Sequence, residues 1–231
     1  MFGFGDQFYV CGTMKNTWIR LLNMTIGLFL TALGIIITIK ANIGYAPWEV
    51  FHVGLSNTIG ISFGITTIIV GVIIAIIVTL MGEKLGLGTI LSMVMTGLFA
   101  DMILILNVIP LSENDVVGGI MLIAGLFIIS LGTYFYIKTG YGVGPRDNLM
   151  VVLARKTKMP VGICRVIVEF VVTVVGWFLG GMVGIGTIIS VVAIGFCIQL
   201  TFGLFKFDVT GIKHESLSDT FHMLKTRSNT E

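Results

Sequence analysis

Charged side chains are scarce in this chain, and those within apolar sequence are candidates for chemistry. Asp101, Arg165 and Glu169 interrupt stretches that are otherwise hydrophobic. An ionised side chain is costly inside a bilayer, so such residues usually face the protein interior and take part in function. Arg165 and Glu169 are four positions apart and would share one helix face, where they could form a structural ion pair. Alternatively, Glu169 and Asp101 could carry protons and Arg165 could bind an anion.

A second group of polar residues lies in two related segments. ANIGYAPWEVFHVGLSNTIG begins at Ala41, and TGYGVGPRDNLMVVLARKTK begins at Thr139. In each segment a proline stands where a helix would begin, at Pro47 and Pro145, and an acid follows two residues later. Helix capping alone would explain this pattern. The alternative is that both helix N-termini face a shared cavity and bind an anionic group.

These two groups supply the candidate site. The substrate-binding candidates are Pro47, Glu49, His52, Pro145, Arg146, Asp147, Arg165 and Glu169, and the coupling candidates are Asp101 and Glu169. Lys40 and Lys138 would add positive charge to the cavity, or would extend toward the lipid headgroups. One histidine beside one acid is too little for a metal site, and the three cysteines have no paired spacing. No catalytic motif is present, so the sequence predicts neither an enzyme nor a cofactor.

The composition identifies the medium in which these residues work. The chain is 55% hydrophobic and 11% charged, whereas a soluble domain carries about 25% charged residues. An ordinary soluble domain is therefore excluded. The net charge of +2 gives no indication of nucleic-acid binding. The expected partners are the lipid bilayer, a small-molecule solute and, in a homo-oligomer, further copies of the chain.

Largely apolar stretches predict six membrane-spanning helices, two of which carry the charged residues Asp101, Arg165 and Glu169. They fall at residues 21–39, 60–82, 85–108, 116–137, 162–180 and 186–205. With the N-terminus in the cytoplasm, 13 of the 14 basic residues lie on the cytoplasmic side, and Lys40 is the exception. This distribution follows the positive-inside rule. We therefore expect a multi-pass membrane protein with both termini in the cytoplasm.

The spans form an internal repeat. Residues 33–101 align without a gap to residues 131–199, and 20 of the 69 pairs are identical. The predicted regions are an N-terminal cytoplasmic segment 1–19, a first repeat 20–110, a second repeat 116–205 and a cytoplasmic tail 206–231. Each repeat has three spans, an odd number, so the second copy must enter the membrane in the opposite orientation. Inverted repeats recur in secondary transporters, although duplication of a stable three-helix unit would leave the same pattern.

Each repeat is also predicted to contain a short helix after its first span. A helix of about 10 to 12 residues would be about 15 to 18 Å long, too short for a hydrocarbon core of about 30 Å. It would lie at the interface or enter the membrane as a broken, re-entrant helix. The expected fold is therefore all-α, with six transmembrane helices in an inverted 3+3 repeat and a short helix in each half.

Several segments resemble the YczE-like bacterial membrane proteins, which are related to the YitT/YyaS group. They are KANIGYAPWEV, GISFGI, GVGPRDNLM, RVIVEF and GWFLGGMVGIGT, and the resemblance covers residues from about 20 to 205. Glu49 stands where family members commonly have Asp. The resemblance implies an integral protein of the bacterial cytoplasmic membrane, without a specific activity, and directs attention to the proline, arginine and acidic residues above.

Two functions remain open from the sequence. The first is a small secondary transporter or permease-like protein that binds an organic, anionic or amphipathic solute between inverted repeats. The second is a membrane scaffold or accessory protein that supports a biosynthetic or stress process. In that case the basic run Arg155-Lys156-Thr157-Lys158 would bind a partner or anionic lipid.

Overall fold

The protein is all-helical over the part of the chain that the structure describes. This computed structural model describes residues 17–83, 86–142 and 144–207, so most of the predicted N-terminal segment and tail lie outside it. The helices are α1 (Thr17–Lys40), α2 (Pro47–Ile59), α3 (Phe63–Leu80), α4 (Leu87–Leu106), α5 (Asp115–Ile137), α6 (Pro145–Thr157), α7 (Val161–Phe178) and α8 (Ile185–Leu204). All but α2 and α6 are long and apolar enough to cross a membrane. The predicted all-α fold with six spans is confirmed.

The two halves of the chain share one pattern of helices. Helices α6, α7 and α8 begin and end 98 residues after α2, α3 and α4, and α5 begins 98 residues after α1. The short helices α2 and α6 have 13 residues each, slightly more than predicted. Each ends where the next residue, Gly60 or Lys158, adopts a left-handed backbone conformation. At about 20 Å, neither can cross a core of about 30 Å.

Helices α1 and α5 cross at two pairs of glycines. Gly27 packs against Gly132, and Gly34 packs against Gly125, so closely that a methyl group on any of them would lie within 2.9 Å of backbone atoms in the other helix. The pairs follow opposite orders along the two helices, so α5 runs antiparallel to α1. In the repeat, Gly27 is equivalent to Gly125 and Gly34 to Gly132, so the two glycine pairs are equivalent to each other. This is the arrangement expected of an inverted repeat.

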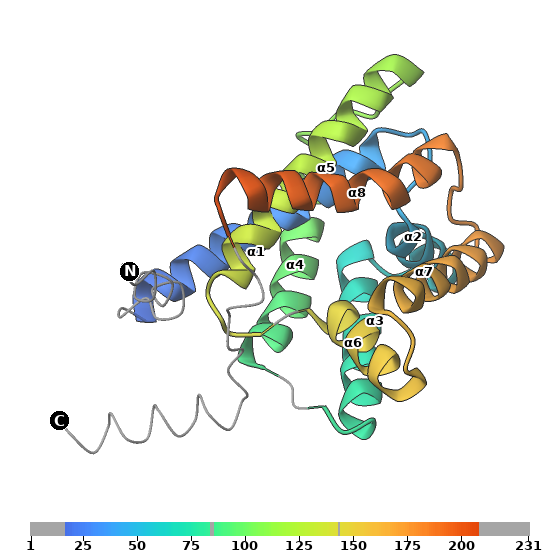
Figure 1. The fold of residues 1–231 in the computed structure, drawn as a ribbon. Helices are drawn as coiled ribbons and strands as arrows, with labels where there is room; N and C mark the ends of the chain where they lie inside the picture. The colour runs from blue at the N-terminus through green and yellow to red at the C-terminus, as the bar shows by residue number, and fades with distance from the viewer. Residues whose placement is uncertain (1–16, 84–85, 143, 208–231) are drawn as a thin grey trace, which may run out of the picture.

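The other helices contact one another in equivalent pairs, and α4 and α8 are the ones that lie against the crossing helices (Figure 1). Helix α1 contacts α4 as α5 contacts α8, and α2 contacts α7 as α6 contacts α3. The loops before the short helices are held in equivalent ways. The Gly186 N–H donates to the carbonyl of Ile43, and the Gly88 N–H donates to that of Tyr141, both at 2.8 Å. Each short helix is therefore positioned by a spanning helix of the other repeat.

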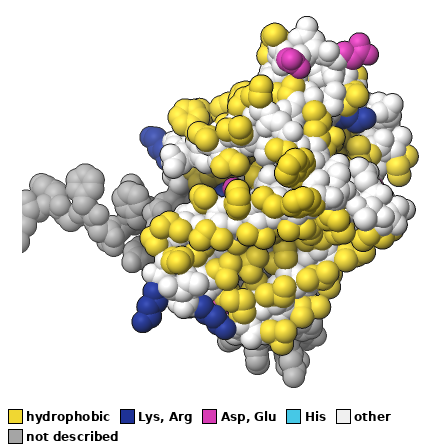
Figure 2. All heavy atoms as spheres, turned by 90° about the vertical axis from the view of Figure 1, so that its right-hand side faces the viewer, with side chains coloured by type: hydrophobic (Ala, Val, Ile, Leu, Met, Phe, Trp, Pro, Cys, Tyr) yellow, Lys and Arg dark blue, Asp and Glu magenta, His cyan; other side chains and the backbone are white. Residues whose placement is uncertain are grey.

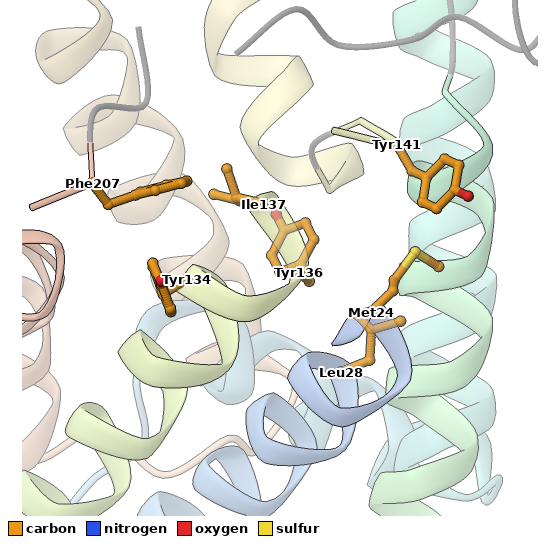
Figure 3. Packing of buried hydrophobic residues seen from close by; sticks show 7 residues of the cluster. All are labelled: Met24, Leu28, Tyr134, Tyr136, Ile137, Tyr141 and Phe207. Carbon is orange, nitrogen blue, oxygen red and sulfur yellow. The ribbon is translucent and has the colours of Figure 1, made fainter. Parts of the chain in front are cut away.

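A cluster of buried side chains further fixes the loop before α6. Its members come from α1, the end of α5 and the following segments: Met24, Leu28, Tyr134, Tyr136, Ile137, Tyr141 and Phe207 (Figure 3). The Arg20 guanidinium lies 4.1 Å from the centre of the Tyr141 ring. It also donates to the Thr139 carbonyl at 2.8 Å. The N-terminus of α6 is thus held in place by contacts from α1 and α5.

The outer surface is apolar. Large hydrophobic side chains are exposed along the spanning helices, for example Ile73 of α3, Ile120 of α5, Phe170 of α7 and Val192 of α8. Figure 2 shows hydrophobic side chains over most of one face, with few charged side chains, mainly near its margins. In water such a face would cause association, whereas lipid tails would cover it. This surface fits contact with a lipid bilayer.

Candidate functional site

A cavity of about 240 Å³ joins the breaks of the two repeats. Its lining residues come from every described helix. The beginnings of α2 and α6 contribute Pro47, Glu49, Pro145, Arg146 and Asp147, and α7 contributes Arg165 and Glu169. The rest of the lining is largely apolar and includes Leu28, Ile129 and Ile194. The cavity therefore has a charged end and a hydrophobic wall, and it contains all the predicted binding residues except His52.

Arg146 connects the two repeats at the charged end. Its Nη1 lies 3.4 Å from Oε1 of Glu49, and its guanidinium lies 4.9 Å from the centre of the Trp48 ring. Both partners belong to α2, whereas Arg146 belongs to α6. Burial raises the pKa of Glu49, and Arg146 opposes this shift. The two short helices therefore meet through an ion pair and a cation–π contact.

His52 lies behind this ion pair and positions Arg146. Its Nδ1 is 3.1 Å from Nη2 of Arg146. Because a guanidinium only donates, Nδ1 must accept and Nε2 must carry the proton. Among the described residues, no group accepts a hydrogen bond from this buried Nε2. Burial and the neighbouring Arg146 lower the pKa of His52 well below its ordinary value, so the ring is neutral.

Helix α7 supplies a second ion pair. Arg165 Nε lies 2.8 Å from Oε1 of Glu169, as their spacing predicts. The repeat places Arg165 at the position of Thr67 and Glu169 at the position of Gly71. All four residues line the cavity. The second repeat therefore presents charged groups where the first presents a hydroxyl and a glycine.

Asp147 is the third carboxylate of the cavity. Its Oδ2 lies 3.4 Å from the Tyr136 hydroxyl, and that hydroxyl accepts the Gly144 N–H at 3.1 Å. Asp147 is accessible to the cavity although protein surrounds it. Burial raises its pKa, and the charges of Arg165 and Arg146 partly oppose this shift. Among the described residues Asp147 forms no ion pair.

Other charged residues lie away from the cavity. Asp101 accepts the Gly64 N–H at 2.6 Å and the Ser62 hydroxyl, so it caps the beginning of α3. Lys40 lies 3.4 Å from the Asn107 side chain, and Lys138 lies 3.2 Å from the Tyr134 hydroxyl. Neither lysine lines the cavity.

Sequence reasoning missed some cavity residues, above all Trp48, Thr67 and Tyr136. An aromatic or hydroxyl side chain in a hydrophobic helix gives no signal that separates a cavity position from a packing position. The described residues include no group of three His, Cys, Asp or Glu that could hold a metal. Cys164 and Cys197 are buried free thiols, and neither lines the cavity.

Comparison with known proteins identifies the family. A family described as "Family of unknown function (DUF6198)" matches residues 18–202. The uncharacterized membrane protein YczE of Bacillus subtilis (strain 168) is 31% identical over 178 residues, which cover 76% of this chain and 81% of that protein. The chain belongs to the YczE-like membrane protein family. The family predicted from the sequence motifs is confirmed, and the protein is an integral, multi-pass membrane protein.

Other relatives of this YczE-like protein match it over similar shares of their length. An uncharacterized protein of Haemophilus influenzae (strain ATCC 51907 / DSM 11121 / KW20 / Rd) is 27% identical over 180 residues, which cover 76% of this chain and 82% of that protein. The uncharacterized protein YyaS of Bacillus subtilis (strain 168) is 29% identical over 169 residues, covering 72% and 84%. No solved structure matches the chain significantly. Since these descriptions name no activity, functional inference depends on the cavity.

Proposed function

We propose that the protein is a small secondary transporter that binds an amphipathic organic solute between its two repeats. The observation that carries this proposal is the cavity that joins the N-termini of α2 and α6. In secondary transporters, substrate sites commonly lie at a repeat interface and are formed by discontinuous helices. The charged end would bind the polar group of the solute, and the apolar wall would contact its hydrocarbon part.

The charges of the cavity indicate the class of polar group. Arg146 is paired with Glu49, and Arg165 with Glu169. A solute cation could pair with the Asp147 carboxylate without breaking either pair, whereas a solute anion would compete with a carboxylate for an arginine. The positive N-terminus of α6 stabilises ionised Asp147. An ammonium-bearing solute is therefore our first choice, and the anionic solute predicted from the helix N-termini is the alternative.

A scaffold role has less support in the geometry. The basic run Arg155-Lys156-Thr157-Lys158 is partly engaged within the molecule, because Arg155 forms an ion pair with Glu83 in the segment after α3. That contact attaches the end of α6 to the first repeat. We also propose that both termini are cytoplasmic in the bacterial cytoplasmic membrane, because basic residues concentrate on that predicted side.

Uptake into proteoliposomes tests this function. The probes are radiolabelled benzyltrimethylammonium and benzenesulfonate, which combine similar apolar groups with opposite permanent charges. We expect saturable uptake of the cation above that of protein-free liposomes, and a strong reduction in Glu169→Gln, which breaks the α7 ion pair. The matched control is Glu83→Gln, because Glu83 pairs with Arg155 outside the cavity.

Each uptake result has a direct meaning. Preferential uptake of benzenesulfonate would favour the anionic alternative. Absence of protein-dependent uptake and binding of both probes would reject the proposed transporter. Equal loss of uptake in Glu83→Gln and Glu169→Gln would show that the cavity ion pair has no particular role.

A further inference from the structure

The two repeats differ in how their last two spans pack. Helix α3 packs along α4, but the equivalent α7 and α8 have no comparable contact in the described chain. Helix α7 instead packs on α2, where a methyl group on Gly54 would lie 2.5 Å from the Gly176 carbonyl oxygen. Arg165 and Glu169 of α7 and Val191 and Ile198 of α8 line the cavity. The cavity is therefore closed between α3 and α4 and bordered by separated helices in the other repeat.

Equivalent glycines show this difference residue by residue. In the first repeat Gly64 and Gly97 are in contact, and a methyl group on Gly97 would lie 2.6 Å from the Gly64 carbonyl oxygen. The second repeat retains both glycines, as Gly162 and Gly195. Among the described residues, a methyl group on either would have no neighbour within 4 Å. The second helix pair thus has the small residues that the first pair uses for close approach, but they are not in contact.

A polar contact accompanies the closed helix pair. The Asp101 carboxylate of α4 accepts from the Gly64 N–H and the Ser62 hydroxyl at the beginning of α3. We call this contact the Asp101 latch. Its equivalent acceptor is Gln199 of α8, which is exposed. The first turn of α7 has no side-chain cap. The Gln199 side-chain oxygen could accept the Gly162 N–H if the two helices came together.

The large and the small residue in the middle of each helix pair are also on opposite helices in the two repeats. Gly71 of α3 faces Met93 of α4, where a methyl group would lie 2.8 Å from Met93 Cβ. The repeat places Glu169 at the position of Gly71 and the smaller Val191 at the position of Met93. Each pair therefore has one large and one small residue at these two positions. This exchange leaves room for α7 to approach α8 around Gly162 and Gly195.

From these differences we infer that the two helix pairs exchange states, so that α7 closes on α8 through Gly162, Gly195 and Gln199 when the Asp101 latch between α3 and α4 opens. This inference rests on the proposed transporter function, because it names the gates of the same cavity. In an inverted repeat, equivalent gates lie toward opposite membrane surfaces. With both termini cytoplasmic, the observed state is open toward the cytoplasm between α7 and α8. Opening of α3 from α4 would expose the cavity on the other side.

Distances between spin labels test the exchange without any solute. In full-length protein with Cys11, Cys164 and Cys197 replaced by alanine, one label pair goes on Ile65 and Leu98. The equivalent pair goes on Ile163 and Phe196. All four labelled side chains are exposed. Double electron–electron resonance in nanodiscs should give a shorter main distance for the first pair than for the second.

Opening the latch should move both pairs in opposite directions. We expect Asp101→Ala to lengthen the distance between α3 and α4 and to shorten the distance between α7 and α8. If Asp101→Ala does not fold, Ser62→Ala removes one hydrogen bond of the latch and should have the same effect with a smaller amplitude. Unchanged distances, or lengthening of the first distance alone, would overturn the inference.

A matched pair of glycine variants tests the second gate. Gly195→Leu and Gly203→Leu lie on the same helix, and no atom of the described chain lies within 4 Å of a methyl group at either position. In an Asp101→Ala background, Gly195→Leu should abolish the short α7–α8 distance, while Gly203→Leu should leave it unchanged. Equal effects of the two substitutions would contradict closure at Gly195.

This experiment separates the two proposals. Rigid helix pairs in a protein that still takes up the probe would refute the exchange and leave the transporter proposal intact. Opposite distance changes in a protein that takes up no probe would support the exchange and refute transport.

Discussion

The sharpest test of the cavity is removal of the charge on Asp147. Asp147→Asn keeps the size of the side chain but removes the carboxylate that, among the described cavity residues, has no arginine partner. Opposite charges 4 Å apart attract by about 4 kcal/mol at an effective dielectric constant of about 20. Burial raises the pKa of Asp147, and the charges of Arg165 and Arg146 partly oppose this shift. Because the same two arginines repel a bound cation, we expect a net loss of about half this attraction, about 2 kcal/mol, or about 30-fold in Kd.

The fluorescence of Trp48 offers a direct measurement of this loss. Trp48 lines the cavity and lies beneath the Arg146 guanidinium. The chain has three tryptophans, so Trp18→Phe and Trp177→Phe leave Trp48 as the reporter. Benzyltrimethylammonium should quench or shift its emission with a Kd about 30-fold weaker in Asp147→Asn. Benzenesulfonate should bind that variant better than the parent.

Two controls make the result decisive. Glu83→Gln removes an acid outside the cavity and should leave the Kd of the cation unchanged. Circular dichroism and thermal unfolding identify any loss of folded protein in Asp147→Asn. Equal cation affinity in the parent and in folded Asp147→Asn would refute the assignment of Asp147 as the ammonium site.

Three further predictions use the same protein. Burial raises the pKa of Asp147, and its carboxylate takes up a proton as the pH falls through that pKa. Titrations of the unsubstituted protein with the cation should therefore give a weaker Kd at low pH. In Asp147→Asn the Kd should no longer depend on pH in this way. Glu49→Gln removes the acid partner of Arg146, so benzenesulfonate should bind about tenfold more tightly in the Trp48 assay, corresponding to about 1.4 kcal/mol; unchanged affinity would show that Arg146 does not reach solutes. Gly64→Ala should destabilise the folded protein in detergent by about 1–3 kcal/mol, because α3 and α4 are already in contact at this position. Gly162→Ala should be neutral or stabilising by up to about 1 kcal/mol. Thermal unfolding measures both effects, and equal changes in stability would contradict the packing described.

The sequence was sufficient to predict the spans and their connections. Each span is a long, largely apolar stretch, and a proline marks the start of each short helix at Pro47 and Pro145, where its missing N–H is not needed. The repeat predicted equivalent helices, and the structure has them. The ends of α2 and α6 could not be placed as closely. They depend on left-handed backbone at Gly60 and Lys158, and lysine does not favour that conformation by itself.

The positions of polar side chains could be predicted only in part. Asp101 and Glu169 are both acids within apolar helices, but Glu169 faces the cavity whereas Asp101 caps α3. The distinction depends on which neighbouring helix each one meets. His52 shares a short helix with Glu49 and still lies behind the cavity wall. The separation of α7 from α8 could not be predicted from the sequence either. An internal repeat predicts that the two helix pairs are equivalent and contains no information on which pair is closed.

The glycine crossing of α1 and α5 has a consequence for biosynthesis. Gly27 and Gly34 belong to α1, which leaves the ribosome before α2 to α8, and their partners Gly132 and Gly125 follow only after α4 has been made. Until then the face of α1 that carries Gly27 and Gly34 has only lipid to contact, and α2 lacks the α7 surface on which it packs. The unit of duplication is therefore half the chain, but the unit of folding is the whole chain. Synthesis of the first half alone should yield inserted helices without a settled tertiary structure.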